Sequence, residues 1–109
     1  MTNAANERQV RKRQQTAKDV DEQRERELKA LLAIPEFRRY LWRHMNETCG
    51  ILQSSANPNG SVQSINIGMQ DVARILWAEI EAADPLAIPR MMTEHYQSQQ
   101  EDHDGRSAA

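Results

Sequence analysis

Large apolar side chains are nearly absent from the first 27 residues and recur at helical spacing from Leu28 onward. Leu28, Leu31 and Leu32 share one face of a helix, because residues three and four apart are neighbours on its surface. Pro35 ends this helix, since the residue before a proline avoids helical backbone, and it suits the first turn of a new helix. The pattern therefore predicts a long N-terminal helix and a second helix that begins at Pro35.

The second helix is expected over residues 35–48. Its apolar stripe recurs every four residues and consists of Phe37, Leu41, Met45 and Cys49. Gly50 is the predicted stop, because glycine adopts left-handed backbone at little cost. Residues 53–64 contain an Asn-Pro-Asn-Gly turn signal, and a connection of this length is expected to be either mobile or functional.

A third helix is expected from residue 64 or 66 to Ala83. Its stripe consists of Ile65, Met69, Val72, Ala73, Leu76, Ile80 and Ala83. Gly68 lies inside this pattern at a cost of about 1 kcal/mol relative to Ala, and we expect it to let a neighbouring helix approach closely. Asp84-Pro85 is an N-cap followed by a first-turn proline, and Pro89 either ends a single turn or begins the last helix.

These elements predict an all-α fold, since no segment alternates apolar and polar residues as a strand does. We expect a small helical domain built on an antiparallel hairpin of the helices at 35–49 and 65–83, with a core centred on Phe37, Leu41, Leu76 and Ile80. The predicted parts are a charged N-terminal helical arm (1–27), a helical core domain (28–96) and a disordered acidic tail (97–109).

Composition narrows the function classes. The 109 residues carry a net charge of −2 with 28% charged residues, so the whole chain is not a polycation. No apolar run approaches the 20 or so residues of a membrane span, and no secretory signal is visible. The single cysteine, Cys49, excludes an internal disulfide. We expect the chain in a host cytoplasm, in a virion, or in both.

The arm has a block of positive charge. Residues 1–18 hold five cations against Glu7 alone, whereas acidic residues predominate over 19–29. The five cations, Arg8, Arg11, Lys12, Arg13 and Lys18, form a candidate arm for binding nucleic acid or a partner. A solvated arm whose charges pair with the neighbouring acidic block is the alternative, and no aromatic residue among the cations supports base stacking.

A second basic cluster surrounds a tryptophan. Arg38, Arg39, Trp42 and Arg43 have the composition of a protein-interface hot spot and form a candidate partner-binding site. The alternative is a solvated helix face on which the arginine stems pack against Trp42 and Tyr40. Met91-Met92 is expected to fill the core or to seal an oligomer contact.

No pattern indicates catalysis, a metal or a cofactor. The three histidines make no ligand pair with each other or with Cys49, which lies at a helix C-terminus where the dipole disfavours a thiolate. Glu79 and Glu81 point to different sides of a helix. We therefore expect a non-enzymatic protein. So small a core often depends on association, either with other copies or with a larger protein.

Two segments together resemble a known group of proteins. Residues 34–55 (IPEFRRYLWRHMNETCGILQSS) and 67–96 (IGMQDVARILWAEIEAADPLAIPRMMTEHY) are similar to small tailed-bacteriophage proteins of the Bordetella podophage type. The matching residues are Pro35, Arg39, Tyr40, Leu41, Trp42, Cys49, Gly50, Asp84, Pro85, Met91 and Met92. The family is encoded near portal and scaffold genes and has no assigned catalysis or functional residues.

The resemblance implies a non-enzymatic bacteriophage structural or head-assembly protein that binds other proteins in the virion or its precursor. Its expected partner is a phage structural protein, such as a portal, scaffold or capsid-associated protein. A homo-oligomer is the other association that we consider. The alternative function is a cytoplasmic nucleic-acid-associated protein that uses the basic arm.

Overall fold

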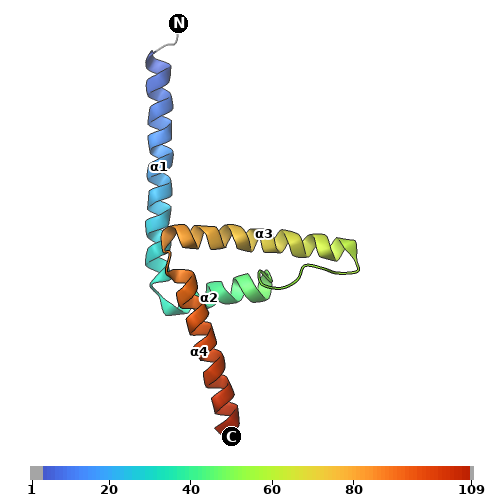
Figure 1. Cartoon of the computed structure of the whole chain (residues 1–109). Coiled ribbons are helices and arrows are strands. Elements are labelled where there is room, and N and C mark those ends of the chain that lie inside the picture. The colour runs from blue at the N-terminus through green and yellow to red at the C-terminus, as the bar shows by residue number, and fades with distance from the viewer. Residues whose placement is uncertain (1–3, 109) are drawn as a thin grey trace.

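The computed structural model describes residues 4–108 of the chain, and the side chains of residues 4–105. It contains the helices α1 (Ala4–Leu32), α2 (Pro35–Arg43), α3 (Gly60–Ala83) and α4 (Ala87–Ala108), and a π-helical turn, η1 (His44–Thr48). No strand occurs between residues 4 and 108. The all-α prediction is confirmed. In Figure 1, α2 and η1 lie below α3 and run antiparallel to it.

Helix α1 projects away from the rest of the molecule (Figure 1). Every described side chain before Leu28 is exposed. The helix forms without burial because it lacks Gly and Pro and carries pairs four residues apart, among them Gln15 with Asp19 and Lys18 with Glu22. Of the arm predicted over 1–27, residues 4–27 are therefore helical with exposed side chains. Residues 1–3 and 109 lie outside the described part of the chain.

The turn after α2 follows from local signals. Pro35 occupies the first turn of α2, as predicted, and Gly50 has a φ of 61°, the left-handed backbone expected of a helix stop. Between them the hydrogen bonding widens into η1, and the Ile51 amide then donates to the Met45 carbonyl at 3.0 Å. This places Ile51 against the core, whereas Leu52 is exposed.

Helix α3 begins at Gly60, several residues earlier than the sequence pattern predicts. The Asn59 side chain accepts hydrogen bonds from the amides of Ser61 and Val62, which is an N-cap arrangement. The connection before it is fastened to α3 rather than free. The buried Gln70 amide donates to the carbonyls of Gly50 and Gln53, at 2.9 and 2.7 Å.

Helix α4 differs from prediction at both ends. Asp84 caps a turn by accepting from the Leu86 amide at 3.1 Å, and Pro89 then stands in the first turn of α4, where a missing amide proton is tolerated. The expected disordered tail from residue 97 is instead a helical continuation to Ala108. Its Gln and Glu residues favour helix, and no proline interrupts them.

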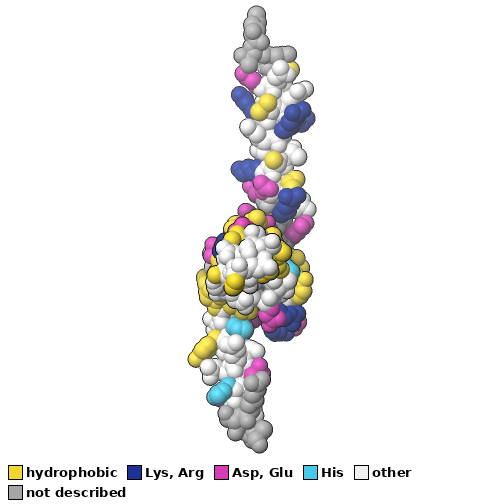
Figure 2. Space-filling view, turned by 90° about the vertical axis from the view of Figure 1, so that its right-hand side faces the viewer, with side chains coloured by type: hydrophobic (Ala, Val, Ile, Leu, Met, Phe, Trp, Pro, Cys, Tyr) yellow, Lys and Arg dark blue, Asp and Glu magenta, His cyan; other side chains and the backbone are white. Residues whose placement is uncertain are grey.

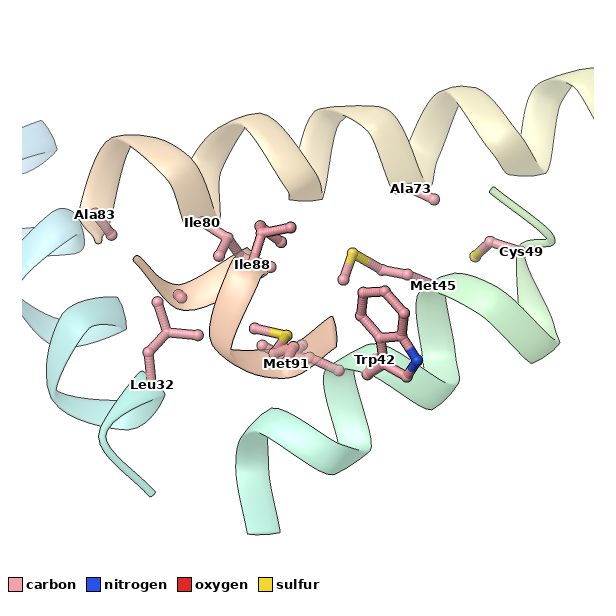
Figure 3. Close-up of a cluster of buried hydrophobic side chains, with 11 residues drawn as sticks. Leu32, Trp42, Met45, Cys49, Ala73, Ile80, Ala83, Ile88 and Met91 are labelled. Atoms are coloured by element: carbon pink, nitrogen blue, oxygen red, sulfur yellow. The ribbon is translucent and has the colours of Figure 1, made fainter. Parts of the chain in front are cut away.

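The core lies where the end of α1 meets α2, α3 and the start of α4 (Figure 3). Leu32, Met45, Ile80 and Met91 are its fully buried large side chains. Of the four residues predicted to form its centre, Leu41 and Ile80 are buried, while Phe37 and Leu76 pack at its edge. The predicted α3 stripe is only partly used, because Ile65 and Val72 are exposed.

Replacing Ile80 with Ala should destabilise the fold by about 2–5 kcal/mol, because a fully buried side chain leaves a cavity and loses its transfer free energy. Ile67→Ala on the same helix is the matched control, since Ile67 is 42% exposed. Its effect should stay below about 1 kcal/mol. Urea denaturation followed by circular dichroism measures both. Equal losses from the two variants would contradict the assigned core.

Candidate functional site

A cleft of about 200 Å³ separates α2 and η1 from α4. It contains all four residues of the sequence-predicted basic cluster and adds six others. The lining residues are Arg38, Arg39, Trp42, Arg43, Asn46, Glu47, Met91, Glu94, His95 and Ser98. Its base is formed by the buried Trp42 and Met91, and its rim is polar. We call it the α2–α4 cleft.

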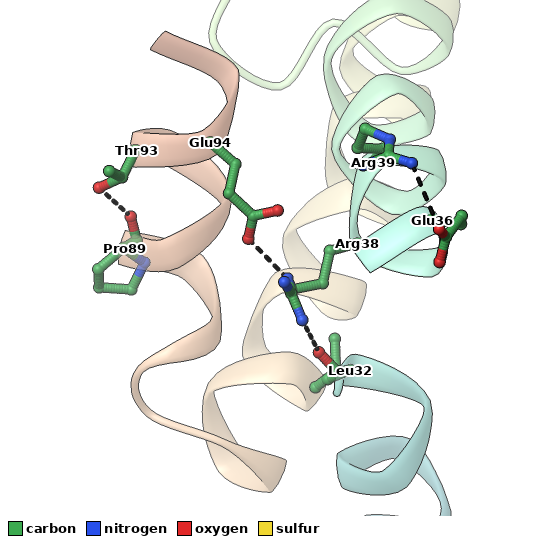
Figure 4. A network of polar contacts seen from close by, with 7 residues as sticks. All are labelled: Leu32, Glu36, Arg38, Arg39, Pro89, Thr93 and Glu94. Atoms are coloured by element: carbon green, nitrogen blue, oxygen red, sulfur yellow. Dashed lines mark hydrogen bonds and ion pairs between the residues drawn. The ribbon is translucent and has the colours of Figure 1, made fainter. Parts of the chain in front are cut away.

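Arg38 holds the inner end of this cleft together (Figure 4). Its side chain is buried, its Nε donates to Glu94 Oε1 at 2.6 Å, and its Nη1 donates to the Leu32 carbonyl at 2.8 Å. The guanidinium therefore joins the last residue of α1 to α2 and α4. Arg38, a predicted partner-binding residue, uses these donors inside the molecule.

Trp42 is a core residue rather than an exposed hot spot. Its side chain is buried, and its ring lies 6.4 Å from that of Trp77 and 5.6 Å from that of His95, between centroids. The exposed His95 therefore covers one edge of the indole at the mouth of the cleft. A group that entered the cleft would meet this imidazole and the aromatic base together.

Arg39 and Arg43 are the accessible cations of the predicted cluster. Both side chains are exposed, and the 3.7 Å ion pair of Arg39 with Glu36 lies in solvent, where such pairs contribute little. Within residues 4–105, Arg43 has no carboxylate within 4.0 Å. The alternative of a solvated helix face does not hold for Arg38, which is buried. The ring of Tyr40 stacks with that of His44, at 6.0 Å between centroids.

The cations of the arm are far from this cleft, along α1. They are all exposed, and none packs on the core. At 3.6 residues per turn, Arg8, Arg11, Lys12 and Lys18 share one broad side of the helix, and Arg13 lies on the opposite side. Lys18 is paired at 4.0 Å with Glu22 of the neighbouring acidic block.

The described side chains offer no cluster of three or more His, Cys, Asp or Glu residues that could hold a metal ion. Cys49 is a buried free thiol, as predicted. What the cleft presents instead is an aromatic and thioether base beneath two exposed guanidinium groups. This arrangement suits an apolar or acidic side chain of a protein partner.

The four cleft residues that come from α4 could not be predicted from the sequence as part of this site. Met91, Glu94, His95 and Ser98 come from α4, and Arg38 and Glu94 are 56 positions apart. The one available signal was helical spacing, which places Met91, Glu94, His95 and Ser98 on one face of a helix. That face could not be assigned to α2 without the three-dimensional arrangement.

No protein-family model, curated protein or solved structure matches this chain. Among the described residues, no helix is both long and apolar enough to cross a membrane.

Arg38→Gln should destabilise the fold by about 3 kcal/mol, because it strands the Glu94 carboxylate and the Leu32 carbonyl in a largely buried site. Arg39→Gln is the matched control on the next residue. Its exposed pair with Glu36 should change stability by less than about 0.5 kcal/mol. Urea midpoints provide the comparison, and a loss at Arg38 no larger than that at Arg39 would refute the internal role.

Proposed function

We propose that this chain is a non-enzymatic bacteriophage structural or head-assembly protein that acts by binding other proteins. The observation that carries the proposal is its open shape. The radius of gyration is 20.3 Å, against about 13 Å for a compact chain of this length, and the extents are 78 × 39 × 15 Å. Long helices project from a small core, as in proteins that are completed by assembly.

Exposed apolar side chains support the same proposal. Ile65, Val72 and Ile75 on α3 are each about 60% exposed, and Leu52, Leu86 and Tyr96 are similarly open on other segments. Scattered exposed apolar residues are ordinary, but three β-branched residues on one helix form a surface that water solvates poorly. Figure 2 looks along α3 and shows hydrophobic side chains around its flanks.

The phage setting comes from the resemblance of residues 34–55 and 67–96 to small podophage proteins, and it makes a portal, scaffold or capsid-associated protein the partner. The α2–α4 cleft supplies a docking point for that partner. Arg39 and Arg43, the exposed cations at its rim, would face acidic groups of the partner.

Mass spectrometry of purified virions and of precursor particles tests this proposal directly. The chain is expected in at least one of them. A phage that encodes the double variant Arg39→Glu and Arg43→Glu should incorporate at least about tenfold less of the chain, since charge reversal places like charges at the contact. Arg90→Glu, an exposed cation of α4 outside the cleft, should incorporate normally. Absence of the chain from both particles would contradict the proposal.

The exposure of all five arm cations favours nucleic-acid association as the alternative function. Titration of duplex DNA at several salt concentrations separates the two functions. Phosphate binding should weaken steeply with salt, with a log–log slope of about −0.9 per neutralised phosphate. If the chain only binds proteins, we expect no DNA binding near physiological salt. The double variant Arg11→Gln and Lys12→Gln should then give the same DNA titration as the unsubstituted chain.

A further inference from the structure

One exposed stripe of α3 is not used by the core or by the α2–α4 cleft. Ile65, Gly68, Val72 and Ile75 follow one another at spacings of three and four, so they lie along one side of the helix. The three apolar side chains are 61%, 59% and 62% exposed. A Cβ added at Gly68 would meet nothing within 4 Å, so no part of the described chain explains a glycine at this helix position.

The stripe has the seven-residue repeat of paired helices. Ile65 and Val72 are seven residues apart and occupy the first apolar position of the repeat, and Gly68 and Ile75, also seven apart, occupy the second. Reversed end to end, it matches itself. In an antiparallel pair Ile65 lies opposite Ile75 of the second helix, and Gly68 lies opposite Val72. A large residue thus faces a small one in the middle, which allows the helices to approach closely.

The stripe runs on into the corner between α3 and α1. Glu79 continues its spacing, and together with Ala82 it lines a cleft of about 510 Å³ shared with α1. The α1 residues there are Asp21, Arg24, Glu25 and Leu28. The exposed stripe is therefore continuous with the packed contact between α1 and α3, and its far end is bounded by the base of the arm.

Charge favours the antiparallel arrangement at that corner. With Ile65 opposite Ile75, the N-terminal end of the second α3, near Gly60, reaches the level of residue 80. A helix N-terminus carries partial positive charge, and the corner presents three carboxylates, those of Asp21, Glu25 and Glu79, against the single guanidinium of Arg24. Asp71 beside the stripe is already paired with Arg74 at 2.7 Å, so it brings no uncompensated charge to the contact.

We infer that two copies of this chain associate through α3, packed antiparallel along Ile65, Gly68, Val72 and Ile75, with each α3 N-terminus directed at the α1–α3 corner of the other copy. The contact is two-fold symmetric, so it closes at two copies. It leaves both basic arms and both α2–α4 clefts open, and it does not depend on the proposed phage function.

Sedimentation equilibrium of the full chain tests the contact. At about 50 µM, which saturates a micromolar Kd, the mass should be twice the chain mass of 12.5 kDa. Val72→Asp and Ile75→Asp should each weaken the dimer at least about tenfold, since an unpaired carboxylate would be buried. Ile67→Asp is the control. Its side chain is 42% exposed and lies about 120° around the helix from the stripe, so the dimer should persist.

Orientation is tested by disulfide trapping in a Cys49→Ser background. Copies with Ile65→Cys should cross-link to copies with Ile75→Cys, and neither variant should cross-link with itself. Self-linking of either variant alone would indicate parallel helices and overturn the arrangement.

Circular dichroism checks that each aspartate variant is folded, which we expect because all three positions are exposed in the single chain. A chain that is monomeric at about 50 µM overturns the inference. So does a dimer that survives both Val72→Asp and Ile75→Asp.

Discussion

One buried guanidinium joins α1, α2 and α4 at a single point. Arg38 donates to the carbonyl of Leu32, the last residue of α1, and to the carboxylate of Glu94 on α4. A buried ion pair is a weak source of net stability but a strong constraint on geometry, because each of its members requires the others in place. Leu32 is also fully buried, so the same junction fixes where the core begins and the arm leaves it.

Helices α4 and α1 both extend from the junction at Arg38. Helix α4 is held against α2 along one side of Trp42, and the α2–α4 cleft exists because Arg38 and Glu94 set the separation of these helices at its inner end. Helix α1 leaves the same point in the opposite direction (Figure 1). One small core therefore positions the proposed partner surface relative to the charged arm. A substitution at Arg38 would alter the position of both.

The sequence predicted well what is decided locally. Pro35 and Gly50 mark the ends of α2 and η1 because each acts through its own backbone, and both signals are confirmed. The start of α3 was missed because the Asn59 cap lies within a segment whose composition is typical of loops. Contacts between residues far apart in the sequence could not be predicted. Nothing near Arg38 indicates Glu94. Both interpretations of the cluster at residues 38–43 left Trp42 accessible, because the residues that cover it come from α3 and α4.

The α3 pattern predicts one apolar face from Ile65 to Ala83, but the structure divides it between two sides of the helix. The residues that face the core or pack against it are Met69, Ala73, Leu76, Ile80 and Ala83. Val72 and Ile75 lie at the same level along α3, but about 60° and 120° around the helix from the middle of that face, so they are exposed. The core can cover only one side of α3, because α2 and η1 pack on that side alone. The direction of these side chains, rather than the length of the helix, is thus the physical origin of the exposed apolar surface through which we infer that a second copy binds.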